Sequence, residues 1–157
     1  MKIKLLAIGK TDDKNLLQLI NVYEKRLKHY IKFSLEVIPD IKNVKNLSEK
    51  QQKEKEGELI LSKLDPTDQL IVLDDKGKHY TSIEFSNFLQ KKMNSGIKQL
   101  VLVIGGPYGF SEAVYKKSVG KLSLSKMTFS HQMIRLFIVE QIYRGFTILK
   151  NEPYHHE

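Results

Sequence analysis

The residues with the clearest chemical potential form a glycine turn that directly follows an apolar run. The segment Val101-Leu-Val-Ile-Gly-Gly-Pro-Tyr-Gly-Phe110 places Gly105 and Gly106 where a buried strand is expected to end. Glycines at the carboxyl end of an α/β strand leave backbone N–H groups uncovered, and such groups can hold a nucleotide-like ligand. A tight turn that needs a positive φ explains the glycines about equally well, but the place at a strand end favours ligand binding. Neither G-x-G-x-x-G nor a P-loop is present.

A second set of reactive side chains stands near the end of the chain. Arg144 lies in a long apolar helix, and Tyr154 and His155 follow that helix directly after Pro153. Side chains of these types can stabilise negative charge or move a proton. Two structural explanations compete with this, because Arg144 can pair with Glu140 one turn earlier and chain ends commonly fray. An aromatic residue directly after a proline favours a tail that docks back on the body.

Other candidate ligands are weaker. Asp74 and Asp75 end an apolar run and could bind a metal or a ribose, but a type I turn closing on Gly77 is favoured. The five histidines show no ligand spacing such as H-E-x-x-H, and there is no cysteine, so we expect no metal site. The lack of cysteine also excludes disulfides and thiol nucleophiles and favours a cytoplasmic protein.

Length and hydropathy predict one domain, residues 1–157, without a membrane span. A chain of 157 residues is long enough to bury a continuous core. The apolar stretch near the start is short and is followed by charged residues, so no signal peptide is expected. The most apolar later region, residues 133–149, carries Arg135, Glu140 and Arg144, which excludes a transmembrane helix.

The charge of the chain favours an anionic partner. The formal net charge is +8, and between Ala113 and Val139 there are five basic residues and no acidic one. The basic residues of this segment are Lys116, Lys117, Lys121, Lys126 and Arg135. Nucleic acid is the preferred partner, although a basic surface that only confers solubility has the same composition.

The hydrophobic periodicity predicts strands alternating with helices, which is typical of an α/β domain with a mostly parallel sheet. Capping boxes at Ser48 with Gln51 and Thr81 with Glu84 mark two helix starts, and Gly96 marks a helix end. The expected strands are residues 2–9, 33–38, 69–73, 100–104 and 122–124, and the expected helices are 15–30, 48–64, 81–96, 111–119 and 131–150.

The last helix is apolar on more than one side. A helix that packs on one face of a sheet needs a single apolar stripe, so this helix is expected to be covered on two sides. Either another subunit or another helix of the same chain can supply the second cover. The shortness of the chain favours a subunit, and hence a homodimer.

The order of several short motifs resembles that of the SPOUT (trefoil-knot) methyltransferases over essentially the whole chain. The resemblance implies an α/β fold with a C-terminal trefoil knot, although open α/β sheets are normally un-knotted. The matching residues are Lys2-Ile-Lys-Leu-Leu-Ala-Ile-Gly9, Asp40, Lys55-Glu56-Gly57, Leu73-Asp74, Ile104-Gly-Gly-Pro107, Leu122-Ser-Leu-Ser125, His131, Arg135, Tyr143-Arg144 and Pro153-Tyr-His155.

The resemblance also implies S-adenosyl-L-methionine as the methyl donor, held by three segments of the knot. Family members often carry Arg or Lys after the tail histidine, where this chain has His156, which is not a fixed positive charge near neutral pH. The implied cofactor-binding residues are Leu73, Gly105, Leu124, Ser125, Lys126, Met127, Thr128 and Phe129.

The branch of the family that the chain resembles most methylates N3 of a pseudouridine in large-subunit (23S-type) ribosomal RNA. Methyl transfer from a sulfonium needs an in-line nucleophile, so positioning should supply most of the rate. Arg144 would stabilise the anion left when N3 loses its proton, and His155 would accept that proton or orient the base. Tyr154 would stack on the base, and the segment from Lys116 to Arg135 would contact phosphates.

Two other classes of protein remain as alternatives. A non-catalytic RNA- or ribosome-binding protein of the same fold shares the basic segment and the apolar helix, but does not need the glycine turn, Arg144 and the tail together. A nucleotide-dependent oxidoreductase needs a phosphate-binding fingerprint that the chain lacks. Binding of S-adenosylmethionine separates the three classes.

Overall fold

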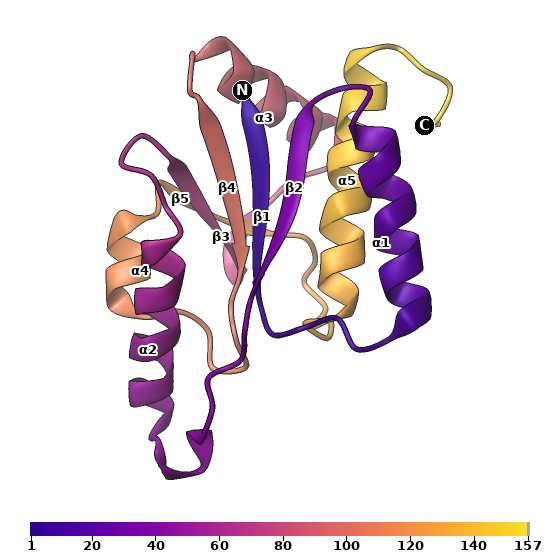
Figure 1. Ribbon diagram of the computed structural model, residues 1–157. Helices are drawn as coiled ribbons and strands as arrows, with labels where there is room; N and C mark the ends of the chain where they lie inside the picture. Colours follow the sequence, from indigo (N-terminus) through magenta and orange to yellow (C-terminus); the bar gives the residue numbers. More distant parts are fainter. Residues whose placement is uncertain (157) are drawn as a thin grey trace.

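Five parallel strands form a central sheet in the order β2-β1-β4-β3-β5. The computed structural model describes residues 1–156 and shows helices on both faces of this sheet (Figure 1). The predicted α/β fold with a mostly parallel sheet is therefore confirmed. The strands are β1 (Lys2–Ile8), β2 (Lys32–Ile38), β3 (Gln69–His79), β4 (Gln99–Ile104) and β5 (Gly120–Ser123).

The helices divide between the two faces of the sheet. One face packs against α1, α3 and α5, and the other packs against α2 and α4, so the buried side chains form two clusters. A short 3-10 turn, Val44–Asn46, precedes α2. The helices are α1 (Lys14–Leu27), α2 (Glu49–Ser62), α3 (Ser82–Asn94), α4 (Glu112–Lys117) and α5 (Met133–Leu149).

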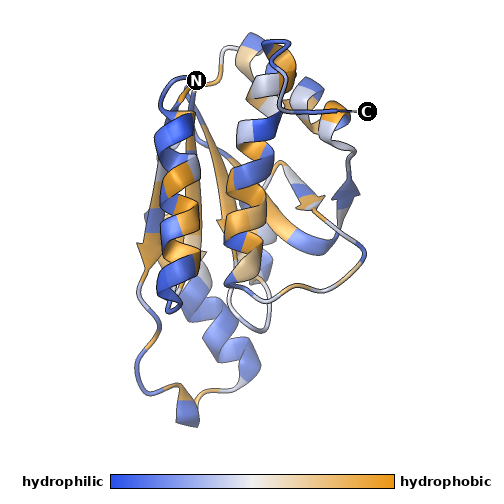
Figure 2. Cartoon of the chain, turned by 90° about the vertical axis from the view of Figure 1, so that its right-hand side faces the viewer, coloured by the Kyte–Doolittle hydropathy of each residue, from blue (hydrophilic) through white to orange (hydrophobic). Residues whose placement is uncertain are grey.

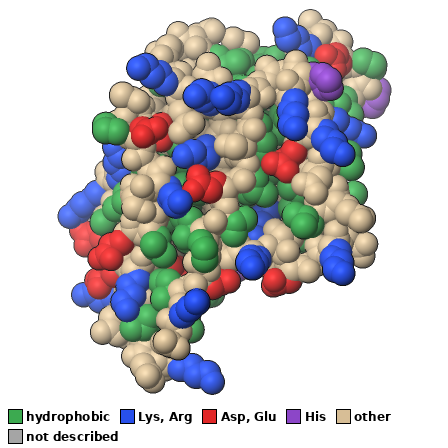
Figure 3. All heavy atoms as spheres, viewed as in Figure 1, with side chains coloured by type: hydrophobic (Ala, Val, Ile, Leu, Met, Phe, Trp, Pro, Cys, Tyr) green, Lys and Arg blue, Asp and Glu red, His purple; other side chains and the backbone are tan. Residues whose placement is uncertain are grey.

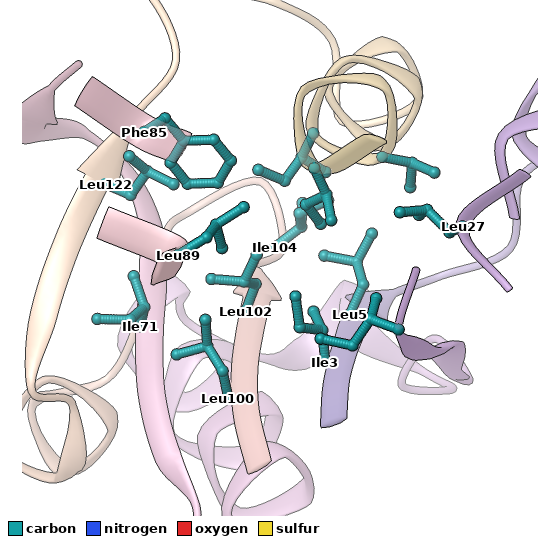
Figure 4. Packing of buried hydrophobic residues seen from close by; sticks show 14 of the residues in the cluster. Ile3, Leu5, Leu27, Ile71, Phe85, Leu89, Leu100, Leu102, Ile104 and Leu122 are labelled. Atoms are coloured by element: carbon teal, nitrogen blue, oxygen red, sulfur yellow. The ribbon is translucent and has the colours of Figure 1, made fainter. Parts of the chain in front are cut away.

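The central strands are apolar on both sides because both faces of the sheet are covered. Residues 100–104 of β4 are all buried. Figure 4 shows Leu100, Leu102 and Ile104 of β4 on the same side of the sheet as Leu5 of β1, in the larger core cluster. Val101 belongs to the cluster on the opposite face, as the alternation of side chains along a strand requires.

Local sequence signals set the helix ends. The Ser48 and Thr81 hydroxyls each accept a hydrogen bond from the backbone N–H three residues on, and both predicted capping boxes are complete. Gly96 has a φ of 74° two residues after the last residue of α3, which confirms it as the residue that ends this helix. Most predicted elements match the observed ones to within about two residues, the usual uncertainty of helix and strand ends.

Strand β3 is longer than the sequence predicted. The expected type I turn over Asp74–Gly77 is wrong, because β3 continues to His79 and its pairing with β5 shifts register between Leu73 and Lys78. A Cβ on Gly77 would lie 2.5 Å from the backbone carbon of Leu122. Gly77 is therefore needed where two backbones cross closely, which the sequence cannot distinguish from a turn glycine.

Helix α5 packs between α1 and α3 of the same chain. These two helices cover much of the broad apolar surface of α5. Helices of the same chain therefore supply at least part of the second cover that the sequence predicted. Within residues 1–156, no helix combines the length and the hydropathy that crossing a bilayer requires. Figure 2 views the α1 and α5 side of the molecule, where both helices carry hydrophobic segments beside hydrophilic ones.

Candidate cofactor pocket and catalytic tail

A cavity of about 450 Å³ opens at the carboxyl ends of β4 and β5 and beside the middle of β3. Three separate chain segments supply most of its wall, namely residues 73–76, 104–110 and most of 122–129. Lys126 is the one implied cofactor-binding residue that does not line it. Those that do are Leu73, Gly105, Leu124, Ser125, Met127, Thr128 and Phe129.

The glycine turn owes its residues to two different physical requirements. The backbone N–H of Gly109 donates to the carbonyl of Gly106 at 3.1 Å, and Gly109 adopts a φ of 81°. Gly105 and Gly106 have no positive φ, so the expected conformational reason fails for them. A Cβ on Gly106 would overlap the Glu56 carboxyl, and one on Gly105 would lie 3.0 Å from the Phe110 ring. The paired glycines are thus required by space.

Helix α2 packs against the glycine turn through its residue Glu56. The Glu56 side chain is only 3% exposed, and its Oε1 accepts a hydrogen bond from the Gln52 amide at 2.9 Å. Burial raises the pKa of Glu56 above its ordinary value, while the Gln52 bond works against that rise. A Cβ on Gly57 would overlap the Ser111 side chain just beyond the turn, so Gly57 allows α2 to approach Ser111 closely.

Asp74 and Tyr115 form a hydrogen-bonded pair on the wall of the cavity. The Tyr115 hydroxyl donates to Asp74, and the backbone N–H of Lys76 donates to the same carboxylate at 2.8 Å. Burial opposes ionisation of Asp74, but these donors hold its pKa below the ordinary value. Burial and the Asp74 charge raise the pKa of Tyr115 to about 12. The aspartates at the end of the first apolar part of β3 therefore line a cavity rather than a turn.

The segment after β5 is tied down by its own hydroxyl groups. The Ser123 hydroxyl donates to the carbonyl of Ser125, and the Ser125 hydroxyl accepts from the backbone N–H of Met127, both at 2.9 Å. Further along, the Phe129 ring packs against Phe137 of α5 with centroids 4.8 Å apart. The third wall of the cavity is thus ordered without any regular secondary structure.

Arg144, Tyr154 and His155 do come together in space, around Glu140 of α5. Glu140 Oε1 accepts hydrogen bonds from Arg144 Nε at 3.0 Å, from Arg144 Nη2 at 2.6 Å and from the Tyr154 hydroxyl at 3.0 Å. Arg144 Nη1 lies 3.4 Å from Nδ1 of His155. The ion pair with Glu140, which the sequence offered as an ordinary explanation of Arg144, is present, and the tail is docked on the body as favoured and not frayed.

Tyrosines of α1 and α5 hold the tail in place. The hydroxyls of Tyr23 and Tyr154 are 3.2 Å apart, and the Tyr154 ring meets Tyr143 edge-on at 4.8 Å. The Tyr30 hydroxyl donates to Glu152 at the start of the tail. Burial and the Tyr23 bond raise the pKa of Tyr154, so its hydroxyl stays protonated. Sequence reasoning did not single out Tyr23 or Tyr30, because tyrosines within the expected helix 15–30 have an ordinary packing role.

The electrostatics of Arg144 favour a permanent cation. Partial burial works against its charge, but the bonds to Glu140 hold the pKa of Arg144 above its ordinary value. The Arg144 guanidinium also lies over the Tyr154 ring, 4.7 Å from its centroid. His155 Nε2 is buried and has no hydrogen-bond partner within residues 1–156.

The pocket and the tail lie at opposite ends of α5. Ile134, in the first turn of α5, lines the cavity, whereas Arg144 stands ten residues later in the sequence. Ten residues of α-helix correspond to a rise of about 15 Å. The tail then folds onto Tyr23 of α1, at the end of the molecule where the strands begin (Figure 1). Within one chain, the structure does not bring the catalytic candidates to the cavity.

Only part of the basic segment from Lys116 to Arg135 is exposed to solvent. Arg135 is 1% exposed and donates to the carbonyl of Ile8 and to the Thr11 hydroxyl, so it braces the loop after β1 and cannot contact a phosphate. Lys116 pairs with Glu112 one helical turn away at 3.0 Å. Figure 3 shows Lys and Arg spread over one face with Asp and Glu among them. In the part of the chain the structure describes, no three His, Asp or Glu side chains are grouped to hold a metal ion.

Comparison with known proteins gives a consistent result along the whole chain. The family described as "Predicted SPOUT methyltransferase" matches residues 1–155. Proteins named ribosomal RNA large subunit methyltransferase H are similar over 100% of both chains: 75% identical in Flavobacterium psychrophilum, 74% in Flavobacterium johnsoniae and 68% in Parabacteroides distasonis.

Proposed function

The chain belongs to the SPOUT methyltransferase family, and from this premise we propose that it methylates N3 of a pseudouridine in large-subunit ribosomal RNA. It is an enzyme of that family, and its methyl donor is S-adenosylmethionine. The names of the similar proteins support ribosomal RNA as the substrate, and the motif resemblance supports the N3 position. The observation that carries the proposal is the cavity built by the three segments that the resemblance had singled out.

The residues of the cavity fit S-adenosylmethionine. Its volume of about 450 Å³ lies within the range of small-molecule sites. The backbone of the cavity-lining Gly105 and the hydroxyls of Ser125 and Thr128 can hydrogen-bond a nucleoside, and Leu73 and Leu124 offer apolar contacts. The carboxylates of Asp74 and Asp75 suit the positive charge of the cofactor. Gly105 and Gly106 let the turn pack tightly against Phe110 and Glu56, because a Cβ at either position would displace one of them.

The chemistry assigned to the chain itself is positioning and charge stabilisation. The cofactor, when bound, supplies an electrophilic methyl group. A pseudouridine N3 becomes nucleophilic only when its proton leaves, and the permanently cationic Arg144 would stabilise the resulting negative charge. Glu140 fixes the Arg144 guanidinium through two hydrogen bonds and thereby orients it. His155, with Nδ1 beside Arg144, would accept the proton or hold the base.

A homodimer with composite sites reconciles this chemistry with the separation of pocket and tail. A two-fold axis perpendicular to α5 would place the α5 helices of the two subunits side by side and antiparallel. The carboxyl end of α5 in one subunit then lies near the amino end of α5 in the other, where the cavity opens. We therefore assign the tail of each subunit to the cavity of its partner.

Exposed apolar side chains on α1 and α5 support this dimer face. Leu19 and Val22 on α1 are 49% and 42% exposed, and Met133 at the start of α5 is 39% exposed. Leu136 and Tyr143 of α5 are partly exposed on the same helix. An apolar surface of this kind is typical of a subunit interface.

Contacts with the RNA backbone would come from exposed lysines. Lys117, Lys121 and Lys126 are exposed, and a small enzyme without a separate RNA-binding domain needs phosphate contacts to position its substrate. Such contacts make binding weaken as the salt concentration rises. Since its substrate is the ribosome, the proposal places the enzyme in the cytoplasm.

The test is transfer of a labelled methyl group from S-adenosylmethionine to ribosomes, followed by mass spectrometry of the large-subunit RNA. We expect one methyl group on N3 of one pseudouridine. Binding of ribosomes without transfer would instead support the non-catalytic alternative. Methylation of a different atom or of a different class of RNA would contradict the substrate assignment.

A further inference from the structure

Three large apolar side chains line the cofactor pocket and yet reach solvent. Met127 is 75% exposed, Tyr108 is 45% exposed and Phe129 is 37% exposed. We call these three residues the apolar rim. A single exposed apolar side chain is ordinary, but several around one cavity mark a surface that meets a ligand or partner.

The apolar rim is exposed without being loose. Tyr108 stands at the tip of a turn closed by the Gly109 to Gly106 hydrogen bond, with Pro107 before it. Phe129 packs on Phe137 of α5, and the backbone N–H of Met127 donates to the Ser125 hydroxyl. Because the backbone is already ordered, binding needs to fix only the side chains and not the loops that carry them.

The ring of Tyr108 is free, whereas that of Tyr154 is occupied. Tyr154 has Arg144 over its ring, Tyr143 against it and Glu140 on its hydroxyl. Among residues 1–156 no aromatic ring or cation pairs with Tyr108, and its hydroxyl makes no hydrogen bond. Of these two tyrosines, Tyr108 is thus the one with ring faces available to a base.

We propose that the apolar rim binds an unstacked base of the RNA substrate, with Tyr108 as the stacking ring. The proposal rests on the proposed function, because it takes RNA as the substrate. Single-stranded bases are recognised by stacking on aromatic side chains, and every base offers a flat face for it. On the side of Met127 and Phe129 the charge is complementary to RNA, since both lie in the stretch from Ala113 to Val139 that contains no acidic residue, whereas Asp74 and Asp75 belong to a different wall of the cavity. Lys126, exposed beside Met127, is placed to meet the phosphate of the same strand.

The experiment compares Tyr108→Ala, Tyr108→Phe and Leu59→Ala in the full-length protein with ribosomes as substrate. Leu59 on α2 is 38% exposed and does not line the cavity, so it controls for loss of an exposed apolar group. We expect Tyr108→Ala to raise the KM for ribosomes by about five- to a hundred-fold, which is the value of one base stack. Tyr108→Phe should restore most of this loss, because the ring and not the hydroxyl carries the contact.

Two further measurements decide what Tyr108→Ala has changed. Calorimetry with S-adenosylmethionine should show an affinity within about two-fold of wild type, and light scattering should show the same mass. A wild-type KM for Tyr108→Ala would overturn the proposal. So would a KM that rises only together with the cofactor Kd, or a loss of dimers, because the rim would then serve the cofactor or the partner subunit. Wild-type protein that methylates no ribosomal RNA would refute the proposed function itself, a result distinct from these.

Discussion

The cofactor pocket and the catalytic tail are built in opposite ways. The pocket is shaped mainly by backbone, because Gly105 and Gly106 are required by the space that Phe110 and Glu56 fill. The tail is shaped by side chains, since one carboxylate, Glu140, gathers Arg144 and Tyr154 through three hydrogen bonds.

This difference has a consequence for how each region fails. A backbone cradle tolerates almost no added atom but does not depend on any one charge. A charged network keeps its fold after a substitution, but loses its chemistry when a single partner is removed. Since the two regions lie at opposite ends of α5, damage to one should leave the other intact.

The largest effect is expected from removing the tail. A protein ending at Asn151 should bind S-adenosylmethionine and dimerise normally, because the core is complete before residue 151. Its single-turnover rate on ribosomes should fall by about a hundred- to a thousand-fold, the cost of losing groups that stabilise transition-state charge. Near-normal turnover would show that the tail is only a docked end.

The second-largest effect is expected on cofactor binding in the pocket. Gly106→Val should push against the Glu56 carboxyl and weaken S-adenosylmethionine binding by about ten- to a hundred-fold, the usual range of an overpacking strain. Gly96→Asn is the matched control, because Gly96 has a φ of 74°, open space around it and no part in the cavity. Calorimetry gives the two affinities. If Gly106→Val bound the cofactor like wild type, the steric cradle would be wrong.

A smaller loss of activity is expected when Glu140, which binds Arg144 and Tyr154, loses its charge. Glu140→Gln should lower kcat about ten-fold and leave the cofactor Kd unchanged, because a charged hydrogen bond that orients Arg144 becomes neutral. Glu112→Gln breaks another i,i+4 pair, with the exposed Lys116, and should not affect kcat. Equal effects of the two substitutions would mean that Glu140 only stabilises its helix.

The smallest effect concerns the Asp74 and Tyr115 pair. A depressed carboxyl pKa contributes stability above the pKa of the unfolded chain, and this contribution is lost as the pH falls through the folded pKa. Tyr115→Phe should therefore lower the free energy of unfolding by about 1 kcal/mol at neutral pH, and by less in acid. Urea denaturation across the acid range measures this, and a loss independent of pH would contradict the assignment.

The sequence predicted most of the fold because its signals were local. Apolar runs, two capping boxes and Gly96 fixed most of the elements, and strand-end glycines marked the pocket. It failed at Asp74–Gly77, where turn residues instead form a strand whose glycine meets a distant backbone. It also placed Arg135 among the phosphate contacts, although the loop after β1 buries it. Long-range contacts decided both cases.

The tail shows the same limit more sharply. Sequence reasoning grouped Arg144, Tyr154 and His155, and the structure places them together. It named Glu140 as a possible partner of Arg144, but it did not predict that Tyr154 and Tyr23 join this pair, because an aromatic on an apolar helix face has an ordinary structural explanation. Nor could it reveal that the tail is remote from the pocket of its own chain.

Complementation between two defective subunits tests the central claim most directly. Tail-truncated protein and Gly106→Val protein are each expected to be nearly inactive, and they are co-expressed to form mixed dimers. If each site joins the pocket of one subunit to the tail of the other, a mixed dimer holds one intact site. An equal mixture should then recover about a quarter of wild-type activity, since half of the dimers are mixed and each has one of two sites. Mixed dimers without any recovered activity would contradict the composite site.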